Sequence, residues 1–148
     1  MSWVRVYIHM VFTTKTREPF LNSSAIRKKA FQHIKQNATE KTIRLDCING
    51  YQEHAHCLIS LGKEQSISKV AQLIKGESSF WINQNNLTES KFIWQDDFGA
   101  VGVSESHIER VRKYIHNQEA HHTKITFTKE VDGFMNKYNW TLIKGDDL

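Results

Sequence analysis

The sequence predicts an α+β fold with a ferredoxin-like βαββαβ core, in which two helices cover one face of an antiparallel sheet. Two patterns carry this prediction. Apolar residues recur at every second position where a strand has one buried face, and at every third or fourth position where a helix does. The segments follow the order strand, helix, strand, strand, helix, strand, with two further helices after them. We expect residues 1–148 to form one domain, with the second sheet face free to hold a site.

The first strand covers residues 3–12, where apolar side chains occupy every second position: Val4, Val6, Ile8, Met10 and Phe12. Arg5, Tyr7 and His9 fall on its opposite face. A polar connector follows, and Ser23-Ser24 supplies an N-cap for the first helix. The buried side of that helix recurs every four residues: Ile26, Ala30, Ile34 and Ala38.

The middle of the chain contains two strands and the second helix. The second strand has apolar residues at alternate positions: Ile43, Leu45 and Cys47. The third strand covers residues 54–61 and has one apolar face: Ala55, Cys57, Ile59 and Leu61. Ser66 caps the next helix, which Gln84 ends, and its buried side is apolar: Ile67, Val70, Ala71 and Ile74.

The last third of the chain is less regular. Residues 92–103 resemble a strand that Asp96-Asp97 and two glycines interrupt, so we expect a bend there. Ser106 and Glu109 have the spacing of a capping box, which predicts a long helix ending near His121. A final helix over about residues 128–138 has this apolar side: Val131, Phe134, Met135 and Tyr138. The pattern assigns no role to the tail of residues 139–148.

Composition excludes several classes of protein. Apolar residues make up 39% and charged residues 24% of the chain, as in folded globular proteins, and no apolar run is long enough to span a membrane. The chain enters its first strand without a secretory signal, so we expect a cytoplasmic protein in which Cys47 and Cys57 are reduced. The net charge of +4 fits a polyanionic partner and fits an ordinary cytosolic protein equally well.

A histidine pair opens the third strand. His54 and His56 are two residues apart, so both side chains point to the face that the apolar side chains of this strand do not occupy. Two imidazoles on one face can bind one metal ion, and the same pattern also fits two half-exposed histidines at a sheet edge. Cys57 faces the other way and is excluded as a further ligand.

The helix expected after Ser106 carries a second candidate pair. Tyr114 and Gln118 are four residues apart, so their side chains are neighbours on the helix surface, beside the apolar stripe. Without other information, the pair fits a tyrosine at the core margin and a solvated glutamine. His121 and His122 similarly fit a surface pair better than a set of ligands.

Taken together, the two pairs resemble the HUH single-tyrosine transposases of the insertion-sequence 200/605 family, also called IS200-like transposases. The order of the motifs along the chain carries this resemblance, which extends over nearly the whole sequence. The matching segments include both pairs: residues 6–15, 53–60, 67–76, 94–95, 98–100 and 111–122.

The resemblance implies roles for four residues. His54 and His56 would be the metal ligands of the HUH pair, Gln118 the third ligand, and Tyr114 the nucleophile that attacks a DNA phosphate. Two imidazoles and one amide oxygen leave coordination positions open, which suits magnesium or manganese better than a closed zinc site. Because one phosphodiester is exchanged for another, no nucleotide cofactor is required. The family also captures the 5′ end of the cut strand on tyrosine.

The resemblance also implies partners. These are single-stranded DNA with hairpins near the element ends, and a second copy of the chain in a homodimer whose tyrosine helices complete each other's sites. We expect cations outside the metal site to contact DNA: Lys15, Arg17, Lys69, Lys75, Arg112 and Lys113. Trp94 and Phe98 can stack on bases, although core packing explains both better.

Two other functions fit the sequence. A domesticated or inactive relative would bind DNA hairpins without cutting them, but the four candidate residues are all present, which argues against decay. A third possibility is an HUH nickase of replication or plasmid transfer, which we disfavour because these 148 residues contain no helicase or primase domain.

Overall fold

The computed structural model describes residues 1–122 and 125–138, with the side chains of residues 134–138 left out, so the predictions for Phe134, Met135, Tyr138 and the tail lie outside the described part. Contacts along the chain define two compact units, residues 1–118 and 119–148. The first unit holds the sheet. The second contains most of the short helix α4 (Gln118–His122) and all of α5 (Phe127–Tyr138), which confirms the predicted final helix.

The elements of the first unit follow the predicted order. Its strands and helices are β1 (Val6–Thr13), α1 (Ser24–Glu40), β2 (Arg44–Gly50), β3 (His54–Leu61), α2 (Ile67–Gln84), β4 (Gly99–Val103) and α3 (Ile108–His116), with 3-10 turns at Lys15–Arg17 and Glu105–His107. The strands form an antiparallel sheet in the order β2-β3-β1-β4. The α+β fold with a βαββαβ core is therefore confirmed.

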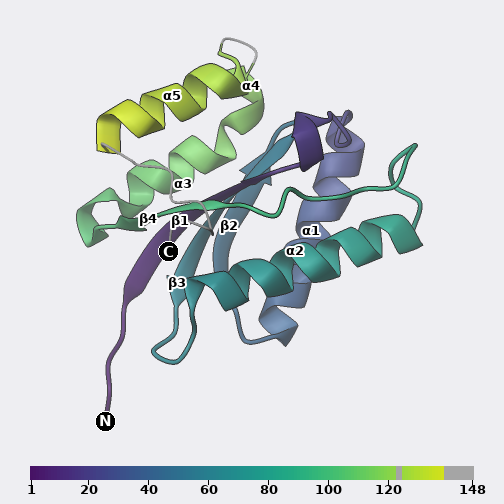
Figure 1. Cartoon of the computed structure of the whole chain (residues 1–148). Helices are drawn as coiled ribbons and strands as arrows, with labels where there is room; N and C mark the ends of the chain where they lie inside the picture. The colour runs from purple at the N-terminus through teal and green to yellow at the C-terminus, as the bar shows by residue number, and fades with distance from the viewer. Residues whose placement is uncertain (123–124, 139–148) are drawn as a thin grey trace. The chain divides into compact units, whose positions relative to one another are not determined.

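The main core lies between the sheet and the helix pair α1 and α2, which cover one face of the sheet (Figure 1). Side chains predicted to face the helices are buried there: Ile8, Met10, Phe12, Ala55, Cys57 and Ile59. Each helix starts where the sequence predicts. The Ser23 hydroxyl accepts a hydrogen bond from the backbone N–H of Ile26, and the Ser66 hydroxyl accepts one from that of Lys69.

The opposite sheet face is not free, which corrects the expectation from the sequence. Helix α3 lies along it (Figure 1). A second, smaller core fills the space between them. Its buried members come from β2, β3 and α3: Cys47, Leu58, Ile108 and Ile115. The apolar stripe of α3 would otherwise be exposed to water, so it packs on the second sheet face.

A β-bulge changes the predicted orientation of Cys47. Leu45 pairs with Ile59 and Cys47 pairs with Leu58, so one extra residue, Asp46, is inserted in β2. Leu45 therefore faces the main core, whereas Cys47 faces the smaller core beneath α3. The simple alternation predicted for this strand is wrong at this point, because sequence spacing does not reveal a bulge.

The irregular strand expected over residues 92–103 is confirmed: Trp94 forms one isolated bridge to Thr14, and after an interruption the strand is regular over β4. The helix predicted after it needs correction. The predicted long helix is divided at Asn117, between α3 and α4. The capping box does not form either: the N-cap of α3 is His107, which has no side-chain capping bond.

In the part of the chain that the structure describes, none of the helices combines the length and the apolar character that a membrane crossing requires.

Candidate functional site

The candidate site lies on the sheet face that α3 covers, where β3 runs beside β1. His54 and His56 are both fully buried on this face, and their ring centroids are 5.0 Å apart. His9 of β1 is buried beside them. The pairing of Val11 with His56 and of Thr13 with His54 fixes how the two strands are aligned, and therefore which side chains of β1 meet the pair.

Each histidine of the pair has a polar partner at Nδ1. The Nδ1 of His54 is 2.7 Å from the Glu53 carboxylate, and the Nδ1 of His56 is 2.9 Å from Nε2 of His9. These contacts orient both rings. A partner that accepts a hydrogen bond from Nδ1–H leaves Nε2 as the position from which a neutral ring can bind a metal ion.

Tyr114 and Gln118 reach this same place in the same chain. The Tyr114 ring stands at 89° to the ring of His56, with centroids 5.5 Å apart. The Gln118 side chain is buried, and its Oε1 lies 3.0 Å from Nε2 of His54. The four residues singled out in the sequence therefore gather at one point of the sheet.

Helix α3 is held on the sheet by polar contacts as well as by the smaller core. The Arg112 guanidinium donates from Nε and Nη2 to the two carboxylate oxygens of Asp46, at 2.8 and 2.7 Å, and also pairs with Glu109. This pairing lowers the pKa of Asp46 below its ordinary value. At the end of α3, the Asn49 amide donates to the His116 carbonyl oxygen at 3.1 Å. The bulge at Asp46 thus helps to place the helix that carries Tyr114.

The predicted DNA-contacting cations divide into two groups. Four are exposed on the surface: Lys15, Arg17, Lys69 and Lys113. The other two, Lys75 and Arg112, are partly buried. Lys75 donates to the backbone carbonyls of Asp96 and Asp97, where burial lowers its pKa, and Arg112 is paired with Asp46.

Trp94 and Phe98 pack in the main core, as the sequence favours. Trp94 is buried, and its indole N–H donates to the Ser78 hydroxyl at 2.9 Å. Phe98 packs partly against the same core.

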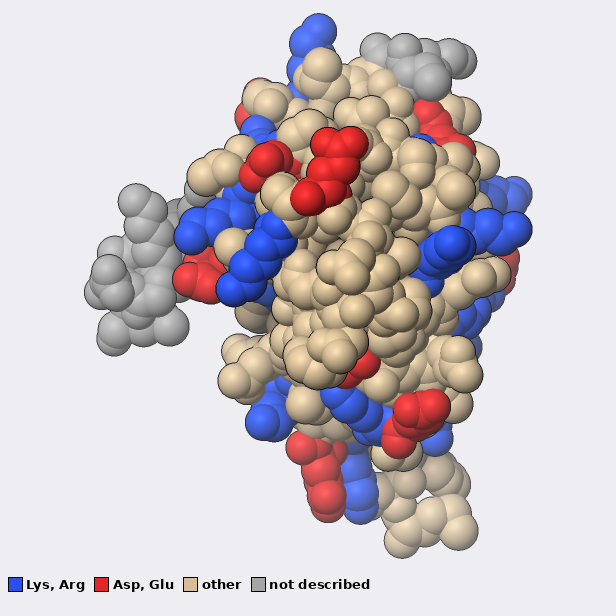
Figure 2. All heavy atoms as spheres, turned by 90° about the vertical axis from the view of Figure 1, so that its right-hand side faces the viewer, with Lys and Arg blue, Asp and Glu red and all other residues tan. Residues whose placement is uncertain are grey.

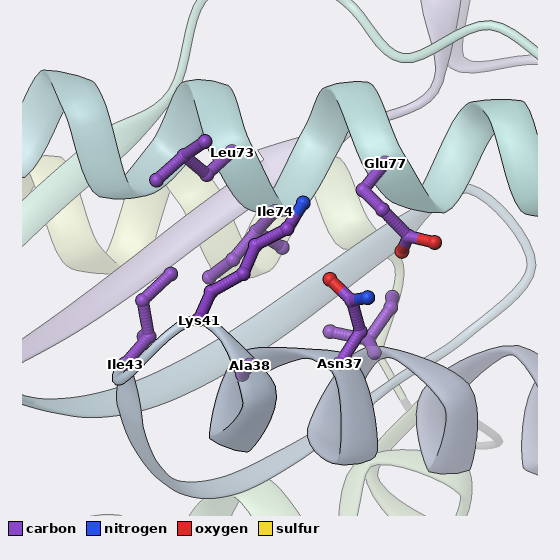
Figure 3. A pocket seen from close by; sticks show the side chains of 8 residues that line it. Asn37, Ala38, Lys41, Ile43, Leu73, Ile74 and Glu77 are labelled. Carbon is purple, nitrogen blue, oxygen red and sulfur yellow. The ribbon is translucent and has the colours of Figure 1, made fainter.

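Two hollows lie elsewhere on the first unit. A crevice between α1 and α2, lined by Ala38, Leu73 and Ile74 among others, leaves no space for a water molecule and is a packing defect (Figure 3). A larger hollow of about 310 Å³ lies at the far end of the site face from His54, where Arg5, Tyr7 and Arg44 line it. It is open to solvent, and two of the side chains that line it, Arg5 and Arg44, are cationic.

His9 and Glu53 were not selected from the sequence as site residues. A signal for His9 was present, because strand alternation placed it on the face opposite the main core. The contact of His9 with His56 could not be predicted from the sequence, since the alignment of β1 with β3 depends on long-range pairing. Glu53 precedes the first histidine directly, and that position alone carries no signal.

Comparison with known proteins places this geometry in a family. A family model described as "Transposase IS200 like" matches residues 2–118. A candidate transposase from Deinococcus radiodurans R1 has a similar fold, with a TM-score of 0.59 and 19% identity over 80% of this chain and 95% of that one. A REP-associated tyrosine transposase bound to a REP hairpin has a TM-score of 0.57 and 15% identity, over 97% and 90% of the respective chains.

Among curated proteins, none matches the chain in sequence. The two solved structures are too distant in sequence to show more than the fold. The family model is different, because it matches far more than half of the chain and includes all four residues of the predicted site. The protein is therefore a member of the IS200-like transposase family.

Proposed function

We propose that the protein is a cytoplasmic, metal-dependent transposase that cuts and rejoins single-stranded DNA through Tyr114. One observation carries the proposal: Tyr114 lies edge-on to His56, and Gln118 lies 3.0 Å from His54, all within one chain. A nucleophile beside a set of metal-binding side chains is the arrangement that phosphoryl transfer by a tyrosine needs.

His54, His56 and Gln118 would hold the metal ion. The separation of 3.0 Å between Nε2 of His54 and Oε1 of Gln118 suits two ligands of one ion, because ligands about 2.1 Å from a metal and at right angles are about 3.0 Å apart. The amide oxygen of Gln118, with water and phosphate oxygens completing the shell, fits magnesium or manganese. When bound, the ion would withdraw charge from the scissile phosphate.

Tyr114 supplies the nucleophile. A free phenol has a pKa near 10 and is almost wholly protonated at neutral pH, so the proton must leave as the oxygen attacks. A phosphorus–oxygen bond to Tyr114 forms while the bond from phosphorus to the 3′ oxygen breaks, and the released strand carries away a 3′ hydroxyl. Attack by a 3′ hydroxyl on the phosphotyrosine reverses the exchange, so the same residues support joining.

The surface offers several places for DNA. Figure 2 shows one face of the molecule, on which Lys and Arg side chains alternate with Asp and Glu around a broad uncharged area. We propose that Lys15, Arg17, Lys69 and Lys113 contact phosphates, and that the hollow beside Arg5 and Arg44 accepts part of the strand. The hairpin held by the REP-associated transposase supports a hairpin-bearing substrate here as well.

We also propose a homodimer, in which each active site is either shared between the two chains or completed by one chain. The family resemblance implies that the two chains exchange tyrosine helices. In the structure, however, Tyr114 and Gln118 lie beside the histidines of their own chain. This supports a site that each chain completes alone. Mixing His54→Ala and Tyr114→Phe chains distinguishes the arrangements: recovered cleavage indicates exchanged helices, and no recovery from confirmed mixed dimers indicates self-contained sites.

Covalent capture of DNA tests the proposed function. Wild-type protein with Mg²⁺ or Mn²⁺ and hairpin-bearing single-stranded DNA should give an adduct that resists denaturation, and Tyr114→Phe should give none while still binding the DNA. Tyr51→Phe is the matched control and should behave as wild type. Hairpin binding without any adduct from the wild-type chain, over a series of sequences and metals, would instead support the non-cleaving alternative.

A further inference from the structure

A third histidine lies behind the proposed metal site and has no part in the function proposed so far. His9 extends from β1 onto the same sheet face, and its side chain is buried, with 4% of the residue exposed. Its Nε2 lies 2.9 Å from Nδ1 of His56. The two ring centroids are 5.1 Å apart and the ring planes are tilted by 34°.

The short distance between two ring nitrogens restricts the hydrogens of both rings. One hydrogen lies between the two nitrogens, so one ring donates and the other accepts. If His56 donates from Nδ1, its neutral ring has a lone pair on Nε2 and can bind a metal ion. If His9 donates instead, neutral His56 carries its hydrogen on Nε2, and that atom cannot be a ligand.

We propose that His9 is a positioning residue, which accepts a hydrogen bond from Nδ1–H of His56 and so fixes the tautomer and ring orientation in which Nε2 of His56 binds the metal. This inference rests on the proposed function, because it assumes that His56 is a ligand. His54 has the equivalent contact from Glu53 at 2.7 Å, so both histidines of the pair are oriented through Nδ1 by a second residue.

His9 also lies close to the proposed nucleophile, Tyr114. Its ring centroid is 6.1 Å from that of Tyr114, with the planes at 70°, while the Tyr114 ring meets His56 at 89°. One buried side chain on β1 therefore borders both the proposed ligand His56 and the attacking tyrosine. Loss of the His9 ring would leave the His56 Nδ1–H buried without this acceptor and would allow the His56 ring to turn.

Metal binding in the absence of DNA tests this role. Binding of Mn²⁺ to the full chain can be measured by the loss of the free-ion signal in electron paramagnetic resonance. We expect His9→Leu, which fills a similar volume but cannot accept a hydrogen bond, to weaken Mn²⁺ binding roughly 10- to 100-fold. His9→Gln places an amide near the position of Nε2 and should recover much of the affinity.

The controls separate positioning from general destabilisation. His33→Leu makes the same substitution on α1, at a histidine that pairs with Glu77 on the far side of the sheet, and should leave Mn²⁺ affinity unchanged. His56→Ala should abolish tight binding. Adduct formation by His9→Leu should return towards the wild-type rate at saturating Mn²⁺. A His9→Leu chain that binds Mn²⁺ as tightly as wild type, with a lower melting temperature alone, would overturn the inference.

The tautomers themselves can be read in the unsubstituted protein, so the test does not depend on a variant that folds. Long-range ¹⁵N–¹H spectra of the metal-free chain should show His56 protonated at Nδ1 and His9 unprotonated at Nε2. The reverse assignment would overturn the inference. If the wild-type chain binds no Mn²⁺, both the proposed metal-dependent function and the role of His9 are wrong. If the wild-type chain binds Mn²⁺ and His9→Leu binds it equally tightly, only the role of His9 is wrong.

Discussion

The small core beneath α3 can be tested with one truncation, Ile115→Ala. Ile115 is fully buried, and with Cys47, Leu58 and Ile108 it forms the buried part of the contact between α3 and the sheet. Truncation of a buried isoleucine to alanine costs about 2–5 kcal/mol, and we expect about 3 kcal/mol here. If that cost acts on the docking of α3, the helix should open roughly a hundredfold more often, since each 1.4 kcal/mol is a factor of ten.

Hydrogen exchange of the α3 amides, together with urea unfolding, measures this effect. Ile74→Ala is the matched control, because Ile74 is nearly as buried but belongs to the main core under α2. Both variants should lose stability, whereas Ile115→Ala should lower the protection of α3 and the rate of adduct formation more strongly. A cost below about 1 kcal/mol, or equal protection of α3 in the two variants, would refute the reasoning.

Two further predictions concern charge and thiols. Because Arg112 lowers the pKa of Asp46, this pair stabilises the fold fully above the ordinary carboxyl value of 3.8, and the contribution disappears as the pH falls through the lower folded-state pKa. Asp46→Asn should therefore be less stable than wild type in urea at pH 7 and converge with it in acid once the Asp46 carboxylate of the folded protein is protonated, and a difference that persists there would contradict the pairing. Burial raises the pKa of the Cys47 thiol to about 12 and raises that of Cys57 as well, so neither should react with a thiol reagent at pH 8 until the protein unfolds. Rapid labelling of the folded chain would contradict this.

The sequence predicts the fold correctly for those elements that bury one face in the main core. The alternation in β1 and β3 predicted which side chains enter the main core, and Ser23 and Ser66 marked the starts of α1 and α2. The packing of α3 was not readable in the same way. Its apolar stripe showed that the helix needs a partner surface, but the pattern does not say which face of the sheet provides it.

The bulge at Asp46 shows a second limit to predicting side-chain orientation from sequence spacing. One inserted residue reverses the faces of all residues that follow it in β2, and it leaves no trace in the spacing of apolar side chains. Cys47 was therefore assigned to the wrong face. The same bulge directs Asp46 towards Arg112, a contact between residues 66 positions apart in the sequence.

The candidate site was predicted in part. Local spacing placed His54 with His56 on one strand face, and Tyr114 with Gln118 on one helix surface, while the resemblance to a family joined the two pairs. The contact of His9 with His56 depends on the pairing of β1 with β3 and could not be read from either segment alone.

The most direct test of the proposed function is to identify the amino acid that becomes attached to DNA. Wild-type protein should be incubated with Mn²⁺ and a hairpin-bearing single strand, digested with protease and nuclease, and examined by mass spectrometry. The account predicts one modified peptide, with the phosphate at the 5′ end of the cut strand on Tyr114 and a free 3′ hydroxyl on the other fragment. A phosphate on any other residue, or cleaved DNA with no covalent adduct, would contradict it.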